Sequence, residues 1–151
     1  MKDQQKTRLI FSLNVAQRAV DRWIESQADG PAALSPAQAG TMFFLSRSNG
    51  ALIGDVAQAL HIGAPAMSGL ANRLEQAGYL LRQRDPEDGR AIRLYQTEEG
   101  RLAGQRAKIA LSALNARLNE GFSEEEMAVV GRWLETLPQR LSMENLQLPQ
   151  E

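Results

Sequence analysis

Residues 53–100 read IGDVAQALHIGAPAMSGLANRLEQAGYL, then LRQRDPEDGRAIRLYQ, then TEEG. Apolar side chains recur at helical spacing in two short runs, 53–60 and 67–74. Two strand-like runs follow at 79–84 and 91–96, and a turn rich in proline, aspartate and glycine joins them. This order predicts two helices with a short turn between them and then a two-stranded hairpin, which together form a winged helix-turn-helix.

A long helix is predicted before this unit. Residues 6–28 carry apolar side chains every three or four positions, so one wide face of the helix is apolar. Asp29-Gly30-Pro31 is expected to end it. A terminal helix cannot bury such a face alone. We therefore expect it to pack on the C-terminal helices, on a second subunit, or on both.

Short sequence motifs mark the ends of the next helices. Ser35 and Gln38 form a capping box, with Pro36 at the first helical position, and this helix is expected to end at Asn49-Gly50. Gly78 is placed to cap the C-terminus of the second helix of the helix-turn-helix.

Two further helices are predicted after the hairpin. Thr97 caps a helix that is expected to run to about Glu120. Ser123 and Glu126 form a second capping box, which begins the last helix. Pro138 is expected to end or kink that helix, because proline lacks a backbone N–H.

The charge balance is close to neutral. The formal net charge is −1 and the sequence pI is about 5.9, which is not the bulk composition of a nucleic-acid binder. Residues 61–84 hold three arginines against one glutamate, while residues 85–96 hold two arginines against three acidic residues. Any affinity for nucleic acid must therefore come from local charge.

Several classes of chemistry are excluded or disfavoured by composition. The chain has no cysteine and a single histidine, His61, so disulfides, thiolate metal sites and histidine clusters are excluded. We expect no cofactor, and without a credible nucleophile–base set we expect no enzyme. The polar N-terminus lacks a signal core and no run approaches a membrane span, which predicts a soluble cytoplasmic protein.

Three segments together resemble a known family, the MarR-type transcription regulators. They are LSPAQ at 34–38, DVAQAL at 55–60 and NRLEQAGYLLRQRDPEDGRAIRLYQTEEG at 72–100. The ordered set in the third segment is specific: arginine-leucine, a glycine cap, an acidic-Gly-Arg turn and a Thr-capped helix. The resemblance covers nearly the whole chain, from the first helix to the last.

The resemblance implies a mainly α fold and a domain plan. Residues 1–151 would form one MarR-type domain, with a winged helix-turn-helix lobe over 35–96 that carries a two-stranded β wing. Residues 6–28 and 98–147 would form a helical dimerisation region. The apolar face of the first helix agrees with this, since it needs a partner.

The resemblance also implies a function. Such proteins are homodimeric DNA-binding transcription regulators, most often repressors, whose two lobes read a pseudo-palindromic site in double-stranded DNA. Many are released from DNA by small, often aromatic or phenolic, acids. The alternative is a winged-helix protein-interaction module with weak or no specific DNA binding, and the near-neutral charge motivates it.

The expected recognition helix, residues 63–77, departs from the family pattern. Relatives place serine, threonine and arginine in its first turns, whereas the exposed positions here are Ala64, Pro65, Ala66, Ser68 and Gly69. Small residues would let the backbone approach the groove, where apolar side chains touch thymine methyls and DNA shape adds specificity. The other interpretation is weaker and less specific binding.

Two residues further along this helix have two possible roles each. Asn72 is expected either to reach a base or phosphate or to be a solvated surface residue. Arg73 resembles the family arginine that pairs with a wing aspartate, which would be Asp88 here. Such a pair would fix the wing against the helix through a charge-assisted hydrogen bond. The alternative is an ordinary surface ion pair.

The hairpin supplies four more arginines. By resemblance Arg90, beside Gly89 at the tip, is the arginine that enters a narrow minor groove, where negative potential is concentrated. Arg82, Arg84 and Arg93 are expected to contact phosphates or to be solvated strand residues. His61 lies in the turn of the helix-turn-helix, where it is a plain turn residue or a pH switch.

Overall fold

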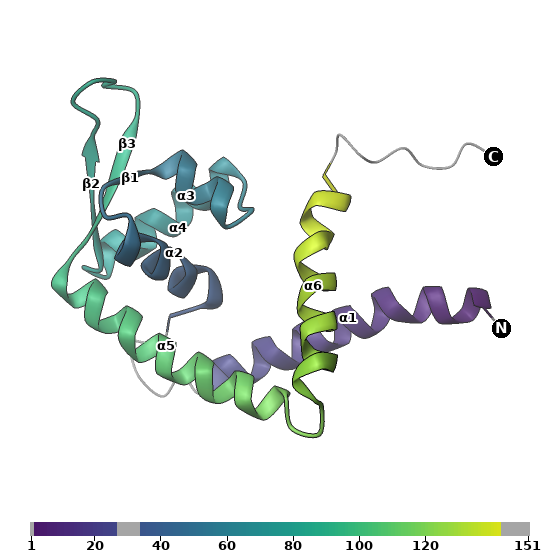
Figure 1. The fold of residues 1–151 in the computed structure, drawn as a ribbon. Coiled ribbons are helices and arrows are strands. Elements are labelled where there is room, and N and C mark those ends of the chain that lie inside the picture. The colour runs from purple at the N-terminus through teal and green to yellow at the C-terminus, as the bar shows by residue number, and fades with distance from the viewer. Residues whose placement is uncertain (1, 27–33, 143–151) are drawn as a thin grey trace, which may run out of the picture.

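The computed structural model describes residues 2–26 and 34–142, with residues 2–7 as backbone alone (Figure 1). The helices of this part are α1 (Lys2–Ser26), α2 (Pro36–Arg47), α3 (Ile53–Ala59), α4 (Ala64–Gln76), α5 (Glu98–Leu118) and α6 (Glu124–Arg140). The strands are β1 (Ala51–Leu52), β2 (Leu80–Arg84) and β3 (Ile92–Gln96). The mainly α fold and the winged helix-turn-helix are therefore confirmed.

The elements fall into a lobe and a set of outer helices (Figure 1). The lobe contains α2, α3, α4 and the sheet, and α5 leads from its base towards α6. Ten buried apolar residues form one cluster within the lobe: Met42, Leu45, Val56, Ala57, Met67, Leu70, Ala71, Leu74, Leu80 and Leu94. Helix α6 has no buried residue.

The sheet has the strand order β1-β3-β2, and both pairings are antiparallel. The hairpin pairs Leu80 with Gln96 at its base and Arg84 with Ile92 near its turn, as two alternating strands predict. Strand β1 was not predicted. Its two residues, Ala51 and Leu52, are too few to show a period, and they join the sheet by pairing with Leu94 and Arg93.

The capping signals are confirmed. The Ser35 hydroxyl accepts from the Gln38 N–H at 3.3 Å, and the Gln38 side chain accepts from the Ser35 N–H at 2.9 Å. Ser123 and Glu126 form the same box at α6. Gly78, with a φ of +77°, follows the end of α4 in the left-handed conformation that glycine adopts without strain.

Two predicted helix limits differ from the structure. Helix α1 already begins at Lys2, and its expected end at Asp29-Gly30-Pro31 lies outside the described residues. Helix α6 continues through Pro138 to Arg140, so Pro138 does not end it there. A proline removes one backbone donor, and beyond it the Leu141 N–H still donates to the Leu137 carbonyl at 2.9 Å.

Helix α5 is fastened to the lobe at its first turn. The Thr97 hydroxyl donates to the Gly78 carbonyl at 2.7 Å, and the Thr97 N–H donates to the Tyr79 carbonyl at 3.1 Å. Gly100 packs its backbone on the same carbonyl, so that a Cβ at this position would lie 1.9 Å from the Tyr79 oxygen. The sequence therefore needs glycine at position 100 to bring α5 this close.

Replacing Gly100 with alanine is expected to destabilise the lobe, because the new methyl group would overlap a backbone oxygen that cannot rotate away. The expected loss is on the order of 3 kcal/mol of unfolding free energy, measured by urea denaturation. Gly54→Ala in α3 is the control, since nothing lies within 4 Å of its Cβ position. It should leave stability unchanged or raise it by up to about 1 kcal/mol. Equal midpoints for the two variants would contradict the close approach.

Candidate nucleic-acid interface

Helix α4 is anchored by one face and exposed on the other. Its buried residues are Met67, Leu70, Ala71 and Leu74. The exposed residues include the predicted set Ala64, Pro65, Ala66 and Ser68, followed by Asn72 and Arg73, and Gly69 is half-buried between the two faces. The N-cap residue is Gly63, so no side chain caps the first turn. The predicted recognition helix thus presents small side chains and backbone to solvent.

Arg82 connects this helix to β2. Its Nε donates to Glu75 at 2.7 Å, its Nη2 lies 2.5 Å from the same carboxylate, and its backbone N–H donates to the other Glu75 oxygen at 3.3 Å. The Arg82 side-chain hydrogen bond lowers the pKa of Glu75 below its usual value. Arg82 Nη2 also donates to Asn72 Oδ1 at 3.3 Å. Asn72 and Arg82, both predicted DNA contacts, therefore contact each other.

The wing is organised by a buried carboxylate. Asp85 is 6% exposed and accepts hydrogen bonds from the backbone N–H groups of Glu87 at 2.7 Å and Asp88 at 2.8 Å. Its second oxygen pairs with Arg93 Nε, and Arg93 Nη1 donates to the Gly50 carbonyl at 2.8 Å. The backbone donors of Asp88 and Glu87, followed by Arg93, lower the pKa of Asp85. One carboxylate thus shapes the turn and joins the wing to the loop before β1.

The predicted pair between Arg73 and Asp88 is absent from the ion pairs of the described residues. Asp88 is exposed and accepts from the Arg90 backbone N–H at 3.0 Å. Arg73 folds along its own helix, with Nη1 3.6 Å from the Cβ position of Gly69. The aspartate that pairs with an arginine in the wing is Asp85, because its side chain is the one buried beneath the turn.

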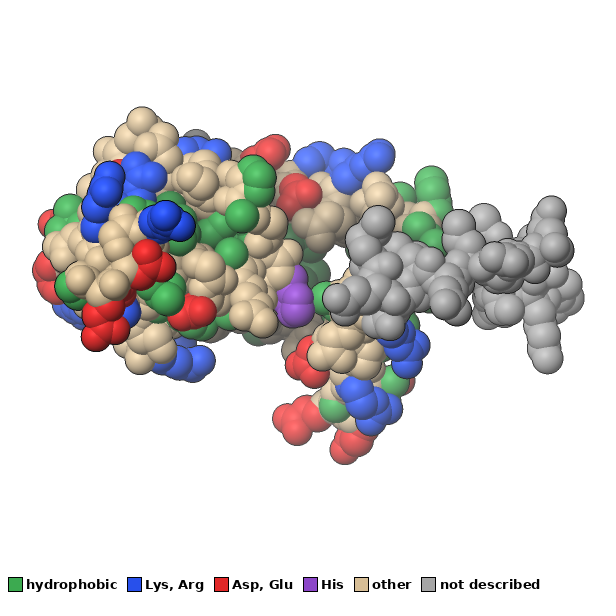
Figure 2. All heavy atoms as spheres, turned by 90° about the horizontal axis from the view of Figure 1, so that it is seen from above, with side chains coloured by type: hydrophobic (Ala, Val, Ile, Leu, Met, Phe, Trp, Pro, Cys, Tyr) green, Lys and Arg blue, Asp and Glu red, His purple; other side chains and the backbone are tan. Residues whose placement is uncertain are grey.

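The predicted arginines therefore separate into two groups. Arg82 and Arg93 have carboxylate partners inside the lobe. Arg73, Arg84 and Arg90 are exposed and form no ion pair among the described residues. Figure 2 shows basic side chains gathered at one end of the lobe, with acidic side chains beside them.

Sequence reasoning missed three residues that hold this surface in place: Asp85, Glu75 and Gly50. An aspartate followed by proline at the start of a turn is a local signal that could have identified Asp85. The contact between Arg93 and Gly50 joins residues 43 positions apart and leaves no such signal.

Comparison with known proteins shows which family the lobe is similar to. Residues 34–91 match the model of the MarR family. The matched stretch lies over the lobe and is less than half of the chain, so the lobe is similar to the MarR family. The HTH-type transcriptional repressor MdtR of Bacillus subtilis (strain 168) is 28% identical over 94 residues. These residues are 62% of this chain and 61% of MdtR, so the match spans less than two thirds of that relative.

Solved structures of transcription regulators have a similar fold. The transcriptional repressor CouR, bound to a 23-mer DNA duplex, is 28% identical, with a TM-score of 0.74, over 83% of this chain and 89% of CouR. The PcaV regulator from Streptomyces coelicolor, in complex with its natural ligand, has a TM-score of 0.75 at 20% identity. That likeness covers 84% of this chain and 89% of PcaV and concerns the fold.

Neither a membrane-spanning helix nor a metal site is present in the part of the chain that the structure describes. Its helices are too short or too polar to cross a membrane. Within the same residues, no three or more histidine, aspartate or glutamate side chains gather as a metal site.

Asp85→Asn is expected to weaken the wing, because the amide cannot accept from two backbone donors and a guanidinium as a carboxylate does. The lowered pKa of Asp85 means that its contribution is complete above its ordinary pKa of about 3.9 and is lost as the pH falls towards the lower folded-state value.

Urea unfolding at pH 6 and at pH 3 tests this expectation. The parent should be more stable than the variant at pH 6, and the difference should shrink at pH 3. Glu99→Gln, at an exposed position in the first turn of α5, is the control for removing one acidic charge. A difference that stays constant between the two pH values would contradict the role of the ionised carboxylate.

Proposed function

We propose that the protein is a homodimeric transcription regulator that binds double-stranded DNA and acts as a repressor. The observation that carries the proposal is the exposed face of α4 beside a wing whose Arg84 and Arg90 have no ion-pair partner among the described residues. The likeness to CouR, a repressor bound to a DNA duplex, supports it. This role requires access to the chromosome, so we also propose a cytoplasmic location.

In this proposal α4 enters the major groove. Ala64, Pro65 and Ala66 are small and exposed, so the helix backbone can approach the base edges and the side chains can touch thymine methyls. The Ser68 hydroxyl lies one turn before Asn72 on the same face and can bond a base or a phosphate. Gly69, half-buried, leaves room for this approach.

The wing arginines take different roles in the proposal. Arg90 at the tip would enter the minor groove, and Arg73 and Arg84 would contact phosphates. Arg82 and Arg93 would act as positioning residues, because Glu75 and Asp85 already balance their charges. Asp88 would help to shape the tip through its bond to the Arg90 N–H.

The helices outside the lobe would form the dimer. In α1, Ile10 is 74% exposed and Phe11 is 70% exposed, and Val130 and Leu134 of α6 are exposed as well. Apolar faces of this extent on helices without a core of their own need a partner. We therefore propose that residues 6–28 and 98–147 pair with a second copy, so that two lobes read a pseudo-palindromic operator.

Release by a small molecule is the second part of the proposal. An acid of aromatic or phenolic type would act by favouring lobe spacings that do not fit the operator. The support is the fold shared with PcaV, which is described in complex with its natural ligand. A ligand that binds equally well to both lobe spacings would not release the protein from DNA.

Salt dependence of DNA binding provides the first test. The parent should prefer the DNA upstream of its own gene over a scrambled duplex, and its affinity should fall steeply with salt. Arg84→Gln and Arg90→Gln should each weaken binding by about 1 to 3 kcal/mol. Each should also reduce the steepness of the plot of log binding constant against log salt concentration, by about 0.9 for each phosphate that is no longer neutralised. Fluorescence anisotropy at several salt concentrations measures both quantities.

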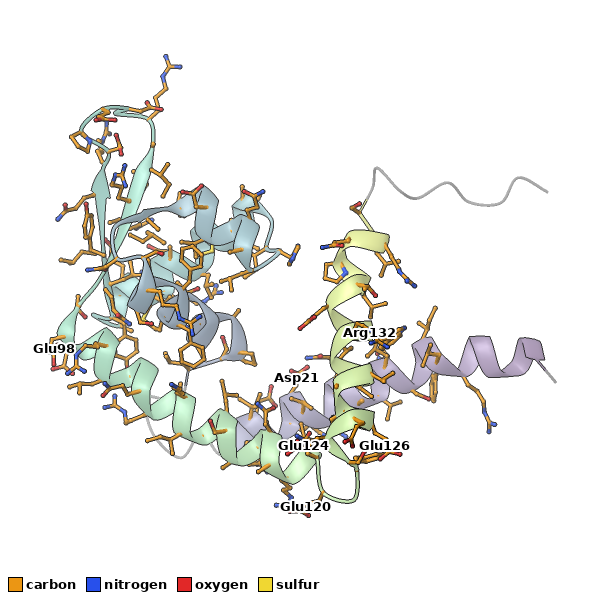
Figure 3. The ribbon with its side chains drawn as sticks, in the orientation of Figure 1. Asp21, Glu98, Glu120, Glu124, Glu126 and Arg132 are labelled. Atoms are coloured by element: carbon orange, nitrogen blue, oxygen red, sulfur yellow. The ribbon has the colours of Figure 1, made fainter. Side chains whose placement is uncertain are left out.

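Arg132→Gln is the matched control. It removes the same charge from α6, which lies apart from the wing (Figure 3). It should leave the slope unchanged. Equal, feeble binding of the parent to both duplexes would favour the alternative, a winged-helix protein-interaction module, which the small side chains of α4 and the net charge of −1 motivate.

The dimer has its own test. Leu134→Glu places a charge in the exposed apolar face of α6 and should convert a dimer into a monomer at micromolar concentration, as measured by light scattering. Arg132→Glu introduces the same side chain at another exposed position of α6 and should remain dimeric. A parent protein that is itself monomeric at this concentration would refute the paired-helix arrangement.

A further inference from the structure

We infer that Asn72 determines specificity by reading a guanine, and that Arg82 sets the orientation in which it does so. This inference rests on the proposed function, because it needs α4 in a major groove. It concerns the one amide side chain on the exposed face of α4 that is bonded to a side chain outside the helix.

The chemistry of the contact fixes the orientation of the Asn72 amide. Arg82 Nη2 lies 3.3 Å from the amide and can only donate, so the carbonyl oxygen Oδ1 must face it. The amide nitrogen Nδ2 then points away from β2 with two N–H donors. No described side chain or backbone group accepts from it, and Asn72 is exposed.

Glu75 holds Arg82 in the position that this contact requires. It accepts from the Arg82 side chain at 2.7 Å and from its backbone N–H at 3.3 Å, so the guanidinium is fixed between two residues that are one helical turn apart. The Asn72 amide is therefore restrained from turning over. Asn72 also follows Ser68 by four positions, which places both on the same exposed face.

This orientation selects among bases. An asparagine that is free to use both of its atoms prefers adenine, donating to N7 and accepting from the N6 amino group. Here the accepting oxygen already faces a guanidinium, and a base amino group would have to approach beside that cation. Guanine offers two acceptors, N7 and O6, and no donor on this edge, so it matches an amide that presents donors alone.

The experiment is selection of binding sites by the full-length dimer from a randomised duplex library, repeated with four variants. The parent should select guanine at one position in each half-site. Asn72→Ala should lose that preference, by about 5- to 150-fold in discrimination, while the remaining positions stay as they are. Asn72→Asp replaces donors by acceptors and should prefer cytosine, whose N4 amino group donates.

Arg82→Met tests the positioning role. It frees Oδ1, so the preference at the same position should move from guanine towards adenine, a change that loss of stability alone would not produce. Arg84→Met, two residues along the same strand, is the control and should weaken binding without altering base preference. Circular dichroism establishes that each variant is folded.

The outcomes distinguish failure of the proposed function from failure of the Asn72 inference. A parent that selects no sequence overturns the proposed function and this inference with it. A parent that selects a site which Asn72→Ala reads identically at every position overturns this inference alone. A preference that stays at guanine in folded Arg82→Met shows that Arg82 does not orient the amide and overturns that part.

Discussion

The placement of the functional elements depends on the backbone at Gly78 and Tyr79. The Tyr79 N–H donates to the Leu74 carbonyl at 2.9 Å and closes α4, while Gly78 supplies the left-handed turn that this closure needs. The carbonyls of the same two residues accept from Thr97 and begin α5. Gly100 then rests on the Tyr79 oxygen. One dipeptide therefore ends the candidate recognition helix, starts the hairpin and fixes the helix that leaves the lobe.

A consequence is that α4, the wing and the first turn of α5 form one body, whereas the outer helices have no comparable anchor among the described residues. The buried cluster is confined to the lobe, and α6 contributes nothing to it. The apolar faces of α1 and α6 can gain their burial energy from a second chain. In the proposed dimer, α5 would be the element that connects these faces to the lobe.

The sequence predicted features that depend on a few neighbouring residues. The caps at Ser35, Gly78 and Thr97 are of this kind, since donor and acceptor lie within a few positions of each other. Contacts between distant segments were not predicted, as with the two-residue strand β1 and the bond from Arg93 to Gly50. The predicted Arg73–Asp88 pair failed for a related reason: Asp85 and Asp88 lie in one turn, and only the folded hairpin buries Asp85 against Arg93.

The ion pairs explain how a chain of net charge −1 could still present a basic surface. A partly exposed pair such as Glu75–Arg82 contributes roughly 0 to 1 kcal/mol of stability, so it matters more for geometry than for energy. In the Asp85–Arg93 pair the carboxylate is buried and also holds the turn. The two pairs join α4 to β2 and the wing to the loop before β1, while Arg73, Arg84 and Arg90 are exposed without an ion-pair partner among the described residues. The first turns of α4 carry almost no hydrogen-bonding side chains, so in the proposed function sequence discrimination would depend on few base contacts and on the shape of the DNA. Such a surface would recognise an operator with strong base preference at a small number of positions. The flanking base pairs would be selected by the shape of the DNA.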